Sequence, residues 1–264
     1  MSTPWPSADA KADRDLLGSA VRAAGALVAA FYERGAKSWD KQPGNPVSEA
    51  DLASDALLQQ HLKTARPDYG WLSEETVDDH SRLSAKRSFV VDPIDGTRAF
   101  VKGRAEFVIA AAVIENALPI AAAIYNPVTQ ELYDAAKGHG ARKNGQPIKV
   151  NHPDALEAAR LMGDPGRLTA LREVCAVAGT VNSAALRLAL IAEGVYDGLV
   201  SVRGKYDWDV AAGHLIIEEA GGKFTARNGD AIAYDRADPC QPPPLAAGPA
   251  LHALLLERLK TMEI

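Results

Sequence analysis

The fold is organised around the stretch Val91-Asp92-Pro93-Ile94-Asp95-Gly96-Thr97. Here an apolar strand runs directly into two carboxylates three residues apart, and the Pro and Gly bend the backbone around them. The two carboxylates, the Ile94 carbonyl and the Thr97 hydroxyl can then converge on one point, as a hard cation requires. Alternatively, both Asp side chains cap backbone amides in a strand-ending turn. The spacing alone favours neither reading.

Two further acidic sites lie far from this stretch. Ser73-Glu74-Glu75 follows the strand-like residues 69–72, and Asp209 stands at the start of a helix that begins at Val210. Taken alone, Asp209 is typical of a helix cap, and the two glutamates are typical of a solvated face. These residues indicate a metal site only if the fold places them close to Asp92.

The residues around the stretch predict an α+β first half. Apolar positions over 15–32 recur at helical spacing and predict a first helix. Residues 36–46 are predicted to form an exposed loop. Ser48 and Asp51 have the spacing of a capping box for a second helix, which ends at Pro67. Asn144-Gly145 predicts a hairpin that delivers Ile148 and Val150 into a further strand. Short apolar runs predict a mostly antiparallel sheet over 89–91, 107–114, 120–125 and 130–134.

The second half of the chain turns helical again. Patterns predict helices over 168–177, 183–193 and 210–220 and a strand over 198–202. We place a boundary near Pro153, with an α+β half (residues 1–152) that carries the metal-binding motifs and an α/β half (residues 153–264) that completes the cleft. The expected class is α/β, in layers.

Composition narrows the classes of function. The chain has 264 residues, 47% of them apolar, and a net charge of −5, which argues against binding a nucleic-acid polymer. Two cysteines, Cys175 and Cys240, are too few for a disulfide framework, so a reducing, cytoplasmic compartment is expected. Residues 1–6 carry no signal-peptide pattern, and the longest apolar run, 107–114, is too short to span a membrane. We therefore expect a soluble protein with no membrane partner.

Together the motifs resemble a known family. Ser73-Glu74-Glu75, the 92–97 stretch, Trp208-Asp209 and Gly221-Gly222 are similar to signatures of the inositol monophosphatase superfamily, and their order is preserved along nearly the whole chain. The resemblance implies a magnesium-dependent, lithium-sensitive phosphomonoesterase. It also implies the layered αβαβα sandwich shared with fructose-1,6-bisphosphatase, and a homodimer.

The resemblance also assigns roles. It implies one metal site made by Glu74, Asp92, the Ile94 carbonyl and Thr97, and a second made by Asp92, Asp95 and Asp209, with two or three Mg²⁺ per active site. Independently, clustered carboxylates repel one another unless cations neutralise them. The resemblance further implies that water activated by the metals, and oriented by Glu74 and Thr97, attacks phosphorus. It also implies that Asp51 hydrogen-bonds Thr97 and that the backbone amides of Gly96 and Thr97 cradle the phosphate.

The substrate is less sharply indicated. With the basic residue Arg98 directly after Thr97, the chain resembles the family branch that hydrolyses adenosine 3′,5′-bisphosphate. Val202 stands where inositol phosphatases carry a Glu that hydrogen-bonds the inositol ring. Arg203 and Lys205 are either contacts for a second phosphate or solvated loop residues, and Ser183 is expected in the leaving-group pocket. The ranking is 3′(2′),5′-bisphosphate nucleotidase, then inositol-1-monophosphatase, then histidinol-phosphatase. A non-catalytic phosphate-binding module is a remote alternative that should have lost a metal carboxylate or the Thr.

Overall fold

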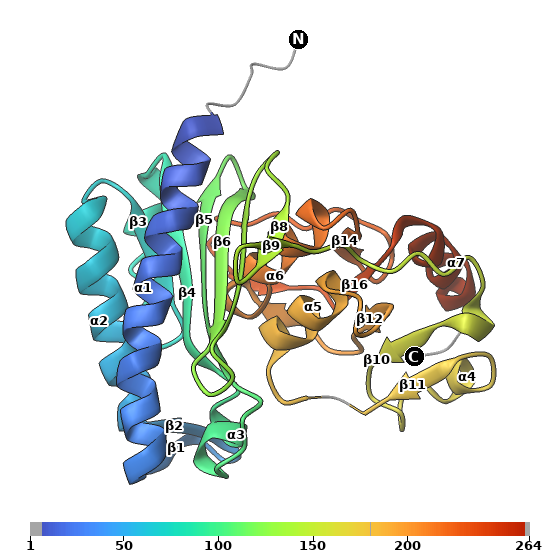
Figure 1. Cartoon of the computed structure of the whole chain (residues 1–264), viewed down its shortest axis with the longest axis horizontal. Coiled ribbons are helices and arrows are strands. Elements are labelled where there is room, and N and C mark those ends of the chain that lie inside the picture. The colour runs from blue at the N-terminus through green and yellow to red at the C-terminus, as the bar shows by residue number, and fades with distance from the viewer. Residues whose placement is uncertain (1–6, 180, 262–264) are drawn as a thin grey trace.

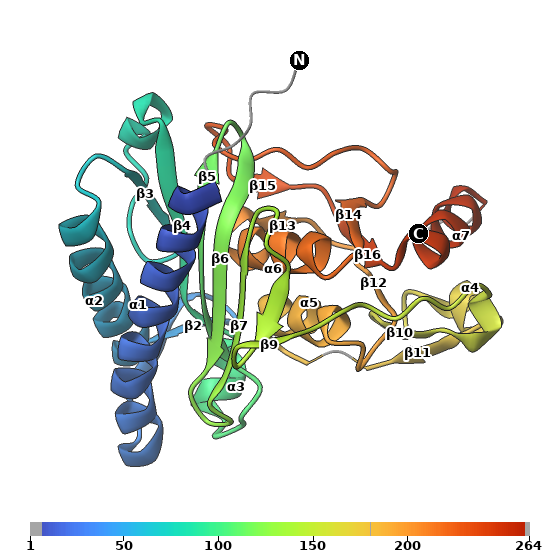
Figure 2. The same cartoon turned by 45° about the horizontal axis from the view of Figure 1, so that its top comes forward.

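Two β-sheets, each covered by helices, organise the chain (Figure 1). The computed structural model describes residues 7–179 and 181–261, so the stretch 1–6, where no signal peptide was read, lies outside the described residues. Both views place helices outside the larger sheet, between the two sheets and beyond the smaller one (Figures 1 and 2). The predicted αβαβα layering is therefore confirmed.

Seven strands form the larger sheet, in the order β3-β4-β5-β6-β7-β8-β9. They are β3 (Gly70–Ser73), β4 (Arg87–Asp95), β5 (Val108–Glu115), β6 (Leu118–Asn126), β7 (Glu131–Ala136), β8 (Ala141–Lys143) and β9 (Gln146–Pro147). All neighbours are antiparallel except β3 and β4, which are parallel, so the prediction of a mostly antiparallel sheet is confirmed. Every residue of β5 is buried, which explains why this strand reads as a continuous apolar run.

Two helices cover the outer face of this sheet, α1 (Ser7–Arg34) and α2 (Glu49–Ala65). The predicted capping box is confirmed, because the Ser48 amide donates to Asp51 Oδ2 at 2.8 Å at the start of α2. Residues 9–34 of α1 are long and apolar enough to cross a membrane by length and composition alone. Their apolar side packs into the core against the sheet.

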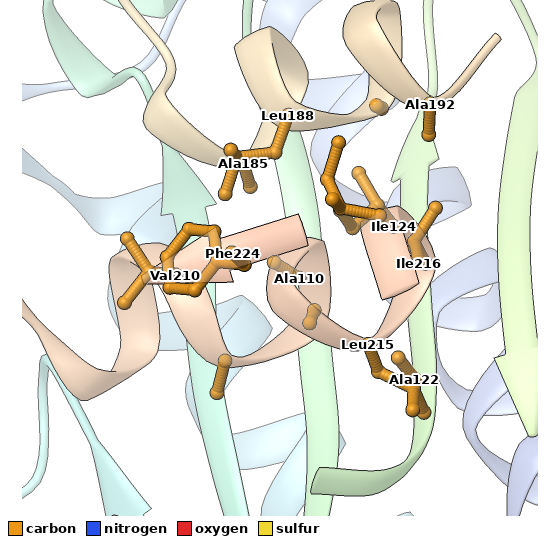
Figure 3. Close-up of a cluster of buried hydrophobic side chains, with 14 of the residues drawn as sticks. Ala110, Ala122, Ile124, Ala185, Leu188, Ala192, Val210, Leu215, Ile216 and Phe224 are labelled. Atoms are coloured by element: carbon orange, nitrogen blue, oxygen red, sulfur yellow. The ribbon is translucent and has the colours of Figure 1, made fainter. Parts of the chain in front are cut away.

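Between the sheets lie α5 (Ala184–Ala192) and α6 (Asp207–Glu219). Figure 3 shows their apolar side chains, among them Leu188 and Ile216, meeting Ala110 and Ile124 of the larger sheet. A Cβ on Gly213 of α6 would lie 2.4 Å from Leu188 Cδ1 of α5. The glycine therefore allows the close approach of the two helices, which brings their N-terminal ends near β4.

The smaller sheet has the order β11-β10-β12-β16-β14. Its strands are β10 (Arg160–Met162), β11 (Ala176–Ala178), β12 (Gly198–Val200), β14 (Lys223–Ala226) and β16 (Pro244–Ala247), and its outer face packs against α7 (Pro249–Lys260). Other short elements are β13 (Lys205–Tyr206), β15 (Cys240–Gln241), α3 (Thr97–Val101), α4 (Thr169–Arg172), and the 3₁₀ turns η1 (Ser81–Ser84) and η2 (Leu156–Ala158).

The two sheets lie on either side of the predicted boundary near Pro153, but one core cluster draws residues from both halves. The division into two domains stays a prediction.

Three local predictions were wrong. Residues 36–46 are not a loop but form most of a hairpin, β1 (Ser38–Gln42) and β2 (Asn45–Ser48); all of β1 is exposed, so no burial pattern reveals it. The helix over 168–177 ends at Arg172, because the chain extends to pair β11 with β10. The strand expected at Ile148 and Val150 is absent; β9 ends at Pro147, and the Val150 amide bonds instead to the Ala220 carbonyl beyond α6.

Candidate active site

A bulge at the end of β4 brings two carboxylates together. The register with β5 shifts between Asp92, opposite Ala110, and Asp95, opposite Val108. In a regular strand, residues three apart point to opposite faces. The extra residue bends the strand and re-aims its side chains. Both carboxylates are buried, and the Ile94 amide donates to Asp92 Oδ1 at 3.1 Å.

Asp209 completes this cluster from α6. The helix begins at Asp207, three residues before the predicted start, so Asp209 lies in its first turn and its Oδ2 accepts from the Tyr206 amide at 2.9 Å. Ligand oxygens of Asp92, Asp95 and Asp209 all lie within 4.8 Å of one another. The cap role and the cluster role of Asp209 therefore coexist, because a carboxylate has two oxygens.

The N-terminus of α5 holds Asp95 in place. Asp95 Oδ2 accepts hydrogen bonds from Ser183 Oγ at 2.7 Å and from the Ala185 amide at 2.5 Å. Ser183 is fully buried and also caps α5, accepting from the Leu186 amide at 2.9 Å. Ser183, predicted as a substrate contact, thus serves a carboxylate of the cluster instead of facing open space.

Glu74 follows β3 and lies near these three carboxylates without belonging to their group; besides burial, its charge helps to raise the pKa of Asp92. The Glu74 amide donates to the Val91 carbonyl at 3.3 Å, next to Asp92. A residue that the sequence did not single out meets it here: Lys41 of β1 places its Nζ 3.3 Å from Glu74 Oε1 and 2.6 Å from Glu75 Oε1. The β1–β2 hairpin, which the sequence did not predict, therefore places the ammonium group of Lys41 at the site.

Thr97 is fixed by Asp51, as predicted. Its Oγ1 lies 2.9 Å from Asp51 Oδ1 and 3.0 Å from the Ile94 carbonyl, and Asp51 Oδ2 accepts from Ser48 Oγ at 2.5 Å. Gly96, just before α3, has φ +107°, and a Cβ there would lie 2.9 Å from the Glu106 carbonyl. Only glycine suits both this backbone angle and this close approach.

The electrostatics of the cluster fit bound cations. Burial, reinforced by Glu74, Asp95 and Asp209, raises the pKa of Asp92 well above its ordinary value. Burial raises the pKa of Glu74 to about 7, although Lys41 opposes this, and burial with repulsion from Asp95 raises the pKa of Asp209 to about 6. Ionising these carboxylates is unfavourable because they are buried and repel one another. Several carboxylate oxygens close together are the ligands that a hard divalent cation prefers.

A pocket lined by several cations and one carboxylate, Asp164, lies near the cluster, because Lys205 in its lining attracts the charge of Asp209. It has a volume of about 320 Å³, and its lining includes Arg98, Arg203 and Lys205, the three cations predicted to meet substrate, together with Val202. The exposed side chain of Arg98 also ties α3 to the β1–β2 turn, since its Nε donates to the Gly44 carbonyl at 3.0 Å.

One cation in this lining was not predicted. Arg187 of α5 follows Ser183 by one helical turn, and helical spacing from that residue is the signal that could have found it.

Comparison with known proteins finds relatives of this chain. A profile of the inositol monophosphatase family matches residues 14–262. The chain is 38% identical to an inositol-1-monophosphatase of Rhizobium meliloti over 201 residues, covering 72% of this chain and 75% of that protein. It is 31% identical to the 3′(2′),5′-bisphosphate nucleotidase CysQ of Escherichia coli O157:H7 over 223 residues, covering 81% and 90%. The crystal structure of the extragenic suppressor protein suhB from Bartonella henselae superposes with a TM-score of 0.86 at 28% identity, covering 96% of this chain and all of that one.

Proposed function

The chain belongs to the inositol monophosphatase family and is a phosphatase, and we propose that it is a Mg²⁺-dependent phosphomonoesterase that prefers a nucleotide bisphosphate such as adenosine 3′,5′-bisphosphate. One observation carries the choice of substrate: a pocket lined by several cations lies near the buried carboxylate cluster. Such a pocket suits a leaving group that keeps a second phosphate.

The donor set supports the choice of metal. Asp92, Asp95 and Asp209 would hold the cations together with Glu74, because hard cations take carboxylate oxygens. Bound Mg²⁺ supplies Lewis acidity that polarises the phosphate and activates water. The non-catalytic alternative expected the loss of a carboxylate or of Thr97, and all are present.

The chain's own residues orient the attacking water. Thr97 Oγ1 has one proton, which Asp51 Oδ1 or the Ile94 carbonyl accepts. The hydroxyl's lone pairs are then left to accept a hydrogen bond from water. Glu74 would orient the same water, because its carboxylate oxygens accept hydrogen bonds. The backbone amides of Gly96 and Thr97 are the proposed phosphate contacts.

The pocket lining supports the nucleotide over inositol. Val202 lies in this lining and has no polar group to accept a hydrogen bond from a ring hydroxyl, whereas Arg203 and Lys205 beside it carry the charge that a second phosphate needs. Inositol 1-phosphate is the second candidate, because the 38% identical relative from Rhizobium meliloti is an inositol-1-monophosphatase.

Phosphate release decides among the substrates. We expect kcat/KM to be higher for adenosine 3′,5′-bisphosphate than for inositol 1-phosphate or histidinol phosphate. Chelation with EDTA should abolish turnover, Mg²⁺ should restore it, and Li⁺ should inhibit it. A higher kcat/KM for inositol 1-phosphate would reverse the choice of substrate, and full activity in excess EDTA would refute the metal mechanism.

We also propose a cytoplasmic homodimer. Cys175 and Cys240 are both free thiols, which agrees with a reducing compartment. Light scattering of the purified protein should give twice the chain mass of 28.0 kDa, and cell fractionation should recover the protein in the soluble cytoplasmic fraction.

A further inference from the structure

Arg187 differs from the buried arginines elsewhere in the chain. Arg14, Arg82 and Arg87 have side chains at most 9% exposed, and each meets at least one carboxylate within 4.0 Å. Arg187 is also partly buried, yet among residues 7–179 and 181–261 no carboxylate lies within 4.0 Å of it. Charged groups taken out of water are normally paired. Arg187 therefore lacks the close carboxylate that the other three arginines have, and an anion from outside the chain can take that place.

The side chain of Arg187 is held in one orientation. Its Nε donates to the Val181 carbonyl at 2.7 Å, just before α5. The two terminal amino groups are then the donors left for an anion, and they form the fork that matches two phosphate oxygens. Arg187 also lines the same pocket as Lys205, near the carboxylate cluster. Its guanidinium is thus already placed and needs little ordering when a ligand binds.

We propose that Arg187 is a specificity-determining residue that binds the second phosphate, the one on the leaving group, of a bisphosphorylated substrate. This inference rests on the proposed function, because it assumes that the carboxylate cluster receives the phosphate that is cleaved. A bidentate contact from Arg187 would let the enzyme select bisphosphates over the corresponding monophosphates.

Burial makes an anion partner favourable. Burial lowers the pKa of Arg187, and attraction to Asp95 and Asp209 only partly opposes this. Once cations neutralise those carboxylates, their attraction for the guanidinium is lost, and the arginine remains desolvated in a basic lining. An anionic ligand restores the lost interaction. The competing role is structural: Arg187 would only stabilise Asp95 and Asp209 in the metal-free protein.

The test compares substrates that differ by one phosphate. Wild type, Arg187→Gln and Arg187→Lys are assayed with Mg²⁺ on adenosine 3′,5′-bisphosphate against adenosine 3′-phosphate. A second pair is fructose 1,6-bisphosphate against fructose 1-phosphate. Inhibition by 5′-AMP, which keeps only the second phosphate, reports binding without turnover. Arg172→Gln, an exposed arginine on α4 outside the pocket, is the matched control.

Arg187→Gln should lower the bisphosphate-to-monophosphate ratio of kcat/KM about tenfold to a hundredfold and weaken 5′-AMP inhibition to a similar extent. Arg187→Lys should fall between this variant and wild type, because a lysine keeps the charge but not the fork. Arg172→Gln should leave the ratio unchanged. If Arg187→Gln does not fold, Arg187→Lys decides by the same ratio.

Equal losses on both members of a pair, accompanied by weaker Mg²⁺ binding, would overturn the proposal in favour of the structural role. A wild type that acts on the fructose pair but not on the nucleotide pair would refute the nucleotide substrate alone, and Arg187 would still be tested on the sugars. A wild type that prefers the monophosphate in both pairs would overturn the inference itself.

Discussion

Asp209→Asn should stabilise the metal-free protein while removing most of its activity. Burial and the nearby Asp95 raise the pKa of Asp209 from 3.8 to about 6. At 1.36 kcal/mol per tenfold change in the proton equilibrium, this corresponds to a cost of about 3 kcal/mol for ionising Asp209 in the folded state. Asparagine keeps the size of the side chain and an oxygen to accept from the Tyr206 amide. The variant should therefore recover about 2–3 kcal/mol, or roughly 5–10 °C in Tm.

The stabilisation should depend on pH. A carboxyl group whose pKa is raised by folding costs nothing at a pH below its unfolded pKa, where it is protonated in both states. The cost develops as the pH rises through about 4 to 6 and is complete above the folded pKa. In EDTA, the Tm of Asp209→Asn should therefore exceed that of wild type clearly at pH 8 and only slightly at pH 4. Scanning calorimetry with and without Mg²⁺ measures both effects.

Asp207→Asn is the matched control. Asp207 lies two residues earlier on the same helix, is buried, and binds Gln241 through Oδ1, outside the carboxylate cluster. It should leave the Tm increase caused by Mg²⁺ intact, whereas Asp209→Asn should diminish it. If Asp209→Asn kept wild-type turnover and the full Mg²⁺ effect, the assignment of Asp209 as a metal ligand would be refuted.

Three further predictions concern single side chains. Thr97→Ala should lower kcat, and Thr97→Ser, which keeps the hydroxyl beside Asp51, should restore much of it; equal losses in both variants would contradict a role for the hydroxyl. Ser183→Ala removes the α5 cap and a bond to Asp95, so unfolding should show a loss of about 1–3 kcal/mol together with weaker Mg²⁺ binding in calorimetry. Val202→Glu should raise KM for adenosine 3′,5′-bisphosphate more than for inositol 1-phosphate, since it adds a negative charge to the pocket lining; equal changes would place Val202 away from the second phosphate.

The layers of the fold could be predicted because buried strands and helices show a pattern of apolar residues in the sequence. Strand β5 is buried on both faces and reads as one apolar run, and the cap at Ser48 depends on residues three apart in sequence. The β1 hairpin has no such signal, because all of its first strand is exposed. Similarly, the apolar spacing over 168–177 suits a helix, but residues 176 and 177 belong instead to β11, which pairs with a strand sixteen residues earlier. Long-range pairing overrides local preference in such segments.

The candidate site divides in the same way. Asp92 and Asp95 could be found from sequence because one bulged strand carries both, so their spacing is itself the geometry. Lys41 could not, because it acts through Glu74, a neighbour that only the tertiary fold supplies. Helical spacing from Ser183 points to Arg187, but only the fold places that side chain in the pocket beside β12. Metal ligands are constrained by the cation's short distances, whereas a cation that meets a phosphate can approach from several elements. Substrate preference in this family fold should therefore change through such scattered cations while the carboxylate cluster stays the same.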